Sequence, residues 1–298
     1  MDHDFSAKRC FALTISHQRR TMSRYENYSE AAKYYDKTRV PTGGETLIGV
    51  LELSRQSGSE FRLLDAGCGT GAYSELVLPH VDRIDAIDIN PDMLAVGRKK
   101  FANGAPDACI TFHQGSIENL PFEAVQFDAV MFNQVLHHLE SAQEGDFSGH
   151  RNALAEAHRV LRSGGVVIVN CTSHEQLRHG YWYLHLIPTA LRALHDRCIP
   201  AAKLEAMLSE IGFAVEGRFV PLDGVLQGAA YVDAEGPLKP GWRKTESSWA
   251  LAPEEEIASA EAKIRELRKS GDLDTYMGEF DAKRRQVGQT TFFVARKV

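Results

Sequence analysis

The sequence predicts an α/β fold in which helices pack on both faces of a parallel sheet. Short apolar segments alternate with amphipathic segments along the 298 residues, and this alternation is typical of strand–helix–strand units with right-handed crossovers. Three glycines, Gly67, Gly69 and Gly71, follow the first apolar segment directly. Because open α/β sheets bind ligands at the carboxyl ends of their strands, this turn is the expected ligand site.

Seven strands are expected, near residues 61–65, 84–88, 109–113, 127–132, 165–170, 213–220 and 290–296. Residues 25–58 look helical apart from a break at 41–44, and a helix over 72–78 follows the glycine turn. The helix before the fifth strand is expected to run to the glycine pair 164–165. A later helix has apolar residues at i, i+3, i+4 and i+7 and closes at Gly212. Its apolar residues are Leu204, Met207, Leu208 and Ile211.

Two insertions, residues 174–200 and 229–288, extend this pattern. The second lies between the last two strands and is too long for a structureless loop, so it should contain folded structure. One helix is expected to begin after Pro253, because glutamates open it and basic residues end it, in agreement with the helix dipole. Residues 1–24 are expected to form a flexible tail. Residues 25–298 are expected to form one domain, with the insertions as a cap on the acceptor side.

The composition excludes several classes of function. The net charge of −6 lacks the basic footprint of a nucleic-acid-binding protein. The five cysteines are odd in number and contain no C-x-x-C pair, which favours a reducing compartment and no structural zinc. No stretch reaches the ~20 apolar residues of a membrane helix, and residues 1–24 lack the apolar core of a secretory signal. We therefore expect a cytoplasmic protein with no membrane span and no nucleic-acid partner.

The glycine turn also indicates the kind of ligand. Its spacing is G-x-G-x-G, whereas a pyrophosphate on a helix end is typically held by G-x-G-x-x-G. Asp65 stands just before the first glycine. A carboxylate at this position would repel a diphosphate, but it suits a ligand that carries a positive charge.

Residues 63–71 resemble motif I of the class I S-adenosylmethionine-dependent methyltransferases, in the methyltransferase type 11 group related to ubiquinone-pathway and small-molecule enzymes. Later segments resemble, in order, that family's second strand, adenine-side loop, fourth strand and fifth-strand region. These are Ile84–Asn90, Gln114–Phe122, Phe127–Leu139 and Arg159–Val169. The resemblance covers about residues 25–220. It implies a Rossmann-like, doubly wound seven-stranded sheet of order 3-2-1-4-5-7-6 with the last strand antiparallel, and S-adenosyl-L-methionine as the cofactor.

The resemblance places the cofactor at the carboxyl ends of the first, second and fourth strands. Asp88, about 20 residues after the first glycine, would bind the ribose hydroxyls, and Asn90 would cap the next helix. Ser116 stands where many relatives have an acidic adenine-binding residue; its hydroxyl accepts one hydrogen bond, and the Ile117 amide is an alternative contact. Met93 would lie against the adenine, pack in the core, or both. The candidate cofactor residues are Tyr35, Asp65, Gly67, Cys68, Gly69, Thr70, Gly71, Asp88, Ile89, Met93, Ser116, Ile117, Asn133 and Gln134.

His137 and His138 leave the fourth strand beside the expected position of the sulfonium. One of them could be a general base for an O–H or N–H acceptor; the alternative is a structural pair. Neighbouring helical residues point about 100° apart, so one ring is expected to face the site. Methyl transfer itself depends more on alignment and exclusion of water. Asn133 and Gln134 stand where metal-dependent relatives have an acidic ligand, so no metal is inferred.

The first insertion concentrates aromatic residues, namely Tyr181, Trp182 and Tyr183. They would either form the wall of an acceptor pocket or the core of the cap. Tyr34 and Tyr35 would close over the cofactor or pack on the sheet. Cys171 and Cys198 suggest a metalloid-methylating alternative, but the chain does not match the cysteine pattern of such relatives.

These features predict an S-adenosylmethionine-dependent methyltransferase that transfers a methyl group in line to a small, partly hydrophobic acceptor. One alternative is a catalytically silent cofactor-binding or scaffold protein on the same fold. A second is a nicotinamide oxidoreductase, which Asp65 and the glycine spacing disfavour. The sequence determines neither the acceptor atom nor the oligomeric state.

Overall fold

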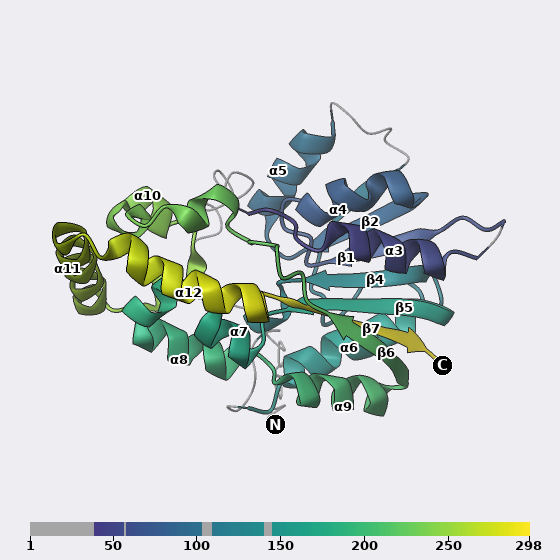
Figure 1. Cartoon of the computed structure of the whole chain (residues 1–298). Helices are drawn as coiled ribbons and strands as arrows, with labels where there is room; N and C mark the ends of the chain where they lie inside the picture. Colours follow the sequence, from purple (N-terminus) through teal and green to yellow (C-terminus); the bar gives the residue numbers. More distant parts are fainter. Residues whose placement is uncertain (1–38, 57, 103–108, 140–144) are drawn as a thin grey trace, which may run out of the picture.

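A seven-stranded sheet with the order β3-β2-β1-β4-β5-β7-β6 forms the centre of the molecule (Figure 1). The computed structural model describes residues 39–56, 58–102, 109–139 and 145–298. The expected tail, residues 1–24, and the candidate residues Tyr34 and Tyr35 lie outside the described residues. The strands are β1 (Arg62–Ala66), β2 (Arg83–Asp88), β3 (Ile110–Gln114), β4 (Phe127–Asn133), β5 (Leu161–Cys171), β6 (Phe213–Phe219) and β7 (Thr291–Lys297).

The predicted strand order and the antiparallel last strand are confirmed. Strands β1 to β5 pair in parallel, whereas β7 runs antiparallel between β5 and β6. The carboxyl ends of the five parallel strands therefore share one edge, which we call the carboxyl edge of the sheet.

Helices cover both faces of the sheet, as the alternating pattern predicts. One face of the sheet is covered by α3 (Gly44–Ser54), α4 (Ala72–Val77) with the following η1 (Leu78–His80), and α5 (Pro91–Phe101) (Figure 1). The other face is covered by α6 (Ser148–Val160) and α9 (Ala201–Ile211). In β5, Val167 and Val169 face the α6 side, and Val166 and Ile168 face the α3 side. Both faces of the strand are therefore buried, which explains its unbroken apolar sequence.

The boundary between α6 and β5 differs from the prediction. The helix ends at Val160, several residues before the glycine pair 164–165. Leu161 is already part of the strand, because it is fully buried and pairs with Phe127 of β4. Pairing with β4 therefore overrides the local helical pattern. Gly164 (φ 75°) lies within the irregular first part of β5.

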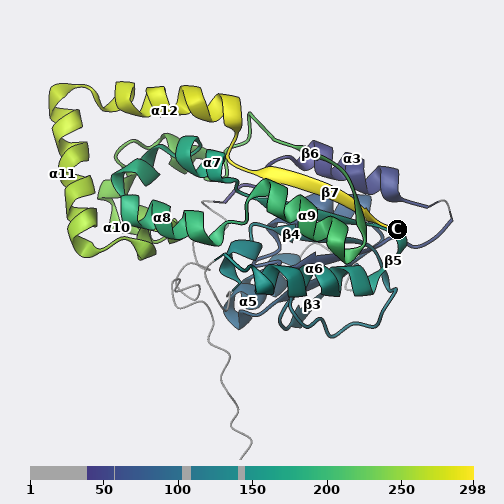
Figure 2. The same ribbon diagram turned by 90° about the horizontal axis from the view of Figure 1, so that it is seen from below.

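The two insertions pack into one helical body, which we call the cap. The first contains α7 (His174–His179), η3 (Trp182–Leu186) and α8 (Pro188–Arg197). The second contains η4 (Gly228–Val232), η5 (Gly236–Leu238), α10 (Pro240–Arg243), η6 (Ser247–Leu251), α11 (Glu254–Ser270) and α12 (Leu273–Val287). Residues of both insertions share one apolar core. The cap lies beyond the carboxyl edge, and α11 and α12 form its outer side (Figures 1 and 2). No helix in the described ranges combines the length and apolar character needed to cross a bilayer.

Candidate functional site

The glycine turn between β1 and α4 leaves its backbone open on one side. The amides of Gly67 and Cys68 both donate to the Ile87 carbonyl, at 2.8 and 3.0 Å. A Cβ on Gly67 would lie 2.4 Å from a methyl carbon of Val135, so no side chain fits there. Gly69 has a φ of 55°, and among the described residues, its chain neighbours aside, no atom lies within 4 Å of the position that its Cβ would take. A ligand can therefore approach the backbone at Gly69.

Asp65, at the end of β1, is a buried carboxylate with one unsatisfied oxygen. Its exposed fraction is 1%. Oδ2 accepts a 2.6 Å hydrogen bond from the Ser74 hydroxyl, whereas Oδ1 has no hydrogen-bond partner of good geometry among the described residues. Burial raises the pKa of Asp65 to about 7; the charge of Asp88 adds to this rise, and hydrogen bonding by Ser74 and Asn133 opposes it.

Asn133, at the end of neighbouring β4, brings an unsatisfied donor to the same edge. Its Oδ1 accepts a 3.4 Å hydrogen bond from the side-chain amide of Asn170. Its buried Nδ2 makes no hydrogen bond of good geometry in the described part of the chain, although it lies close enough to the Asp65 carboxyl to oppose the rise of its pKa. Because β1 and β4 pair directly, this donor and the free oxygen of Asp65 lie near each other. Buried polar atoms without a hydrogen bond of good geometry are uncommon in folded proteins, so an acceptor and a donor of this kind side by side favour a polar ligand site at this edge.

Asp88, at the end of β2, holds the glycine turn as well as facing the site. Its Oδ2 accepts from the Gly69 amide and its Oδ1 from the Asn90 amide, each at 2.8 Å. Burial raises the pKa of Asp88, and these backbone donors oppose the rise. A carboxylate has further lone pairs, so it can bind hydroxyl groups while holding the turn.

The other candidate residues around β2 and β3 divide between capping, packing and exposure. Asn90 caps α5 as predicted, with its side chain accepting from the amides of residues 92 and 93. Met93 and Ile117 are buried, whereas Ile89 is 44% exposed. The Ser116 hydroxyl accepts a 3.2 Å hydrogen bond from the amide of residue 118 and so stabilises its own turn.

The remaining residues of the glycine turn are enclosed. Thr70 is fully buried, and Gly71 forms the left-handed N-cap of α4. Burial, together with the charges of Asp65 and Asp88, raises the pKa of Cys68 well above its usual value. The thiol therefore stays protonated at neutral pH and is a poor nucleophile.

His137 and His138 lie in η2 (Leu136–His138), directly after β4. Their ring centroids are 4.0 Å apart, so the two rings pack against each other in this tight turn; that only one of them faces the site stays a prediction. Burial lowers the pKa of His138 to about 4, with the charges of Arg197 and Arg39 adding to the effect. His138 is therefore neutral at pH 7 and a weak base.

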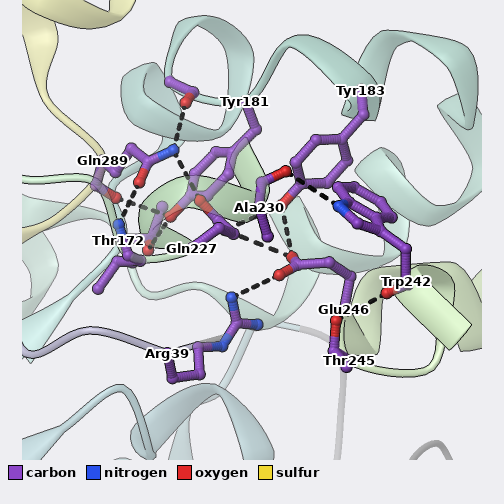
Figure 3. Close-up of polar contacts among 12 residues, drawn as sticks. Arg39, Thr172, Tyr181, Tyr183, Gln227, Ala230, Trp242, Thr245, Glu246 and Gln289 are labelled. Carbon is purple, nitrogen blue, oxygen red and sulfur yellow. Dashed lines mark hydrogen bonds and ion pairs between the residues drawn. The ribbon is translucent and has the colours of Figure 1, made fainter. Parts of the chain in front are cut away.

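A buried carboxylate ties the cap together (Figure 3). Glu246 is only 3% exposed. It pairs with Arg39 at 2.7 Å, accepts from the Tyr183 hydroxyl at 2.5 Å and accepts from the Gln227 amide at 3.3 Å. These contacts join both insertions to the chain segment that precedes α3.

A second set of hydrogen bonds connects the cap to the carboxyl edge (Figure 3). The side-chain oxygen of Gln227 accepts from the side-chain amide of Gln289 at 3.1 Å, and the Tyr181 hydroxyl donates to the Gln289 backbone carbonyl at 2.9 Å. The same hydroxyl lies 3.3 Å from that of Thr172, which in turn donates to Gln134 at 3.3 Å. Cap and sheet edge are thus linked by an unbroken polar path.

The three aromatic residues of the first insertion occupy different places. Trp182 and Tyr183 are essentially fully buried in the cap core, and the Trp182 indole donates to the Tyr231 carbonyl at 2.9 Å. Tyr181 also packs in this core, but its hydroxyl reaches the sheet edge. Among the described residues, no group of three or more histidine, cysteine or carboxylate side chains could hold a metal ion.

Comparison with known proteins identifies the domain. Residues 64–169 match the family model described as a methyltransferase domain. The uncharacterized methyltransferase YcgJ of Bacillus subtilis (strain 168) is 30% identical over 138 residues, which cover 46% of this chain and 51% of that protein. The ubiquinone/menaquinone biosynthesis C-methyltransferase UbiE of Agrobacterium fabrum is 33% identical over 123 residues, covering 40% of this chain and 44% of that protein. These similarities support a class I S-adenosylmethionine-dependent methyltransferase domain over residues 64–169.

The match to these curated relatives spans about half of their length. A solved structure of a putative methyltransferase from an antibiotic biosynthesis pathway of Anabaena variabilis superimposes with a TM-score of 0.66 at 19% identity, covering 87% of this chain and 99% of that chain. This likeness supports the methyltransferase fold, and it extends over much more of the chain than the sequence match does.

The methyltransferase site fits the cofactor of its class, S-adenosyl-L-methionine. The open side of Gly69 leaves room along the turn. Asp65 Oδ1 is a buried acceptor that suits an ammonium group, and Asn133 Nδ2 is a buried donor. The site thus has a buried hydrogen-bond acceptor and a buried donor that could meet the ammonium and carboxylate groups of an amino acid, and the Asp88 carboxylate keeps lone pairs that could accept from hydroxyl groups.

Several residues that build the methyltransferase site were not identified from the sequence. The Tyr73 hydroxyl accepts from the amide of Thr42 at 3.1 Å and from that of Asn170 at 3.0 Å, which joins α4 to β5 and to the segment before α3. Thr290 contacts Gln134 from the start of β7. The polar residue at the end of an apolar strand was a usable signal for Asn170, but nothing local distinguishes Tyr73 or Thr290.

Proposed function

We propose that this protein is an S-adenosylmethionine-dependent methyltransferase that transfers a methyl group in line to a small, partly hydrophobic acceptor. The observation that supports this most is the pair of buried, unsatisfied atoms at the carboxyl edge, Asp65 Oδ1 and Asn133 Nδ2. They lie beside a glycine turn whose Gly69 faces open space, where a cationic nucleoside would be held.

Each contact has a chemical reason. Asp65 would hold the ammonium group of the cofactor, because a buried carboxylate gains most from an opposite charge. Asp88 would accept from the ribose hydroxyls while it keeps the turn in place. Ile89, which is 44% exposed at the end of β2, offers an apolar surface to the adenine.

When bound, the cofactor supplies a methyl group on a cationic sulfonium, and it leaves as a neutral thioether. The protein's own contribution is alignment and exclusion of water, for which the cap over the carboxyl edge is suited. General base catalysis by His138 would contribute little to the rate, since its low pKa makes it a weak base. The acceptor would lie between the cap and η2, near the Tyr181 hydroxyl.

Two measurements test the proposal in order. Isothermal titration calorimetry with S-adenosylhomocysteine should show binding at low-micromolar concentration or tighter. Incubation with a metabolite extract and isotopically labelled S-adenosylmethionine should then yield a labelled product, detected by mass spectrometry. Absence of binding would refute the cofactor assignment; binding without label transfer to any metabolite would favour the silent cofactor-binding protein.

A further inference from the structure

Gln134 adopts a backbone conformation that side chains seldom tolerate. Its φ is 50°, in the left-handed region, which costs energy for a residue with a Cβ. Such strain persists only where surrounding contacts hold it, and it concentrates at functional sites. Gln134 follows the last residue of β4 directly, beside the cofactor turn.

Two neighbouring segments, residues 170–172 and the start of β7, hold Gln134 in place. Its side-chain amide donates to Thr290 Oγ1 at 2.6 Å and to Asn170 Oδ1 at 3.1 Å. Its side-chain oxygen accepts from Thr172 at 3.3 Å, and its backbone amide donates to the Asn170 carbonyl at 2.9 Å. Both ends of the side chain are therefore engaged within the protein, which leaves Gln134 poorly suited to be a direct cofactor contact.

The residues on either side of Gln134 both reach the cofactor turn. Asn133 presents its unsatisfied Nδ2 near Asp65. Val135 packs directly on Gly67, at the position that a Cβ would occupy. The left-handed turn at Gln134 is what allows Asn133 to end the strand and Val135 to lie beneath the glycine turn.

We infer that Gln134 is a positioning residue for the amino-acid end of the cofactor. Its side chain, anchored on β5 and β7, fixes the β4 exit so that the amide of Asn133 stays beside the carboxylate of Asp65. The inference rests on the proposed function, since it assumes that S-adenosylmethionine binds here. In this arrangement Gln134 shapes the site without touching the cofactor, whereas Asp65 and Asn133 would contact it.

The test compares two ligands that differ only at that end of the molecule. S-Adenosylhomocysteine carries the amino-acid group, whereas 5′-methylthioadenosine lacks it. Glycine tolerates the left-handed conformation, so Gln134→Gly keeps the backbone allowed while it removes the side-chain anchors. We expect at least about tenfold weaker binding of S-adenosylhomocysteine by calorimetry, as for loss of a well-placed hydrogen bond to a charged group, and a change within about twofold for 5′-methylthioadenosine.

Two further variants make the result interpretable. Thr290→Val removes the shortest anchor of Gln134 with little change of volume, and it should produce the same selective loss. Val125→Gly is the matched control, because Val125 is also a left-handed residue (φ 61°) but lies before β4, at the opposite end of the strand; it should change neither affinity.

Equal losses for both ligands, or none, in Gln134→Gly and Thr290→Val would overturn the inference while leaving the proposed function intact. If the unmodified protein bound neither ligand, the proposed function would fail, and this inference with it.

Discussion

The raised pKa of Asp65 predicts that cofactor affinity depends on pH in a range where few carboxylates titrate. In the free protein this pKa is about 7. A bound ammonium group favours the ionised form, so binding requires Asp65 to lose its proton. With that pKa, the ionised fraction rises from about 3% at pH 5.5 to about one half at pH 7.0. Affinity for S-adenosylhomocysteine should therefore rise about 15-fold over this interval.

The assay is calorimetric titration at several pH values up to 7.0, because a peptide-like α-amino group stays largely protonated below about pH 7.7. At pH 6, binding should release close to one proton, which is measured by comparing buffers with different ionisation enthalpies. Asp65→Asn should bind more weakly and show neither the slope nor the proton release. A flat profile in the unmodified protein, or the same slope in Asp65→Asn, would refute the reasoning.

The same pKa has the opposite effect on stability. The folded pKa of Asp65, about 7, lies above the unfolded value near 3.9, so between these values the folded state binds more protons than the unfolded state. The contribution of Asp65 to stability is fully present below pH 4 and is lost as the pH rises through 7. A shift of about 3 units corresponds to at most about 4 kcal/mol. Chemical denaturation should therefore show unliganded Asp65→Asn to be more stable than the unmodified protein at pH 8, and this advantage should disappear near pH 4.

Three further predictions follow from burial and open space. Gly69→Ala should reduce S-adenosylhomocysteine affinity at least about 100-fold in a calorimetric titration, because the alanine Cβ would enter the space of the ligand. The control is Gly271→Ala, at another left-handed glycine with open space around it; it should carry the same backbone strain and leave the affinity unchanged. Trp182→Ala should lower the free energy of unfolding by about 3–5 kcal/mol, since the indole is fully buried; a stable variant would show that this side chain is not part of the cap core. Glu246→Gln should cost about 1.5–3 kcal/mol in denaturant unfolding, because the buried carboxylate would lose the charge that strengthens its hydrogen bonds with Arg39 and Tyr183. Asp233→Asn, which breaks a more exposed ion pair of equal length, should cost less than about 1 kcal/mol; equal costs would contradict the argument from burial.

The sheet could be predicted because its signals are local. The central strands contain short apolar runs, and Asn90, two residues after β2, is a residue type that favours the N-cap position of a helix. The end of α6 could not be predicted, because Leu161 adopts an extended backbone only through its pairing with Phe127 on another strand. The packing of His137 on His138 likewise depends on a tight turn that the sequence pattern represents as ordinary helix.

The sequence was enough to propose residues for the cofactor half of the site, but it did not indicate the contacts that connect this half to the cap. Asp65 and Asp88 could be picked out as candidates because of their positions in the sequence relative to the three glycines. Contacts such as Gln134 with Thr290 join residues 156 positions apart, and neither residue has a local pattern that marks it. The aromatic residues of the first insertion fit a pocket wall or a cap core equally well in sequence, and the burial of Trp182 and Tyr183 places both in the core.

Two energetically costly features of the described chain lie on adjacent strands at one edge. Asp65, the penultimate residue of β1, is a buried carboxylate with an unsatisfied oxygen, and Gln134 follows β4 in a left-handed conformation, while most of the other residues of both strands are apolar and buried. An apolar residue at 65 and a glycine at 134 would relieve both penalties. Their concentration beside the open side of Gly69 is therefore what a ligand site requires: the sheet supplies enough stability for its edge to hold groups that gain their partners only on binding. On this reasoning, stability and affinity should change in opposite directions when Asp65 becomes Asn, which an ordinary structural carboxylate would not produce.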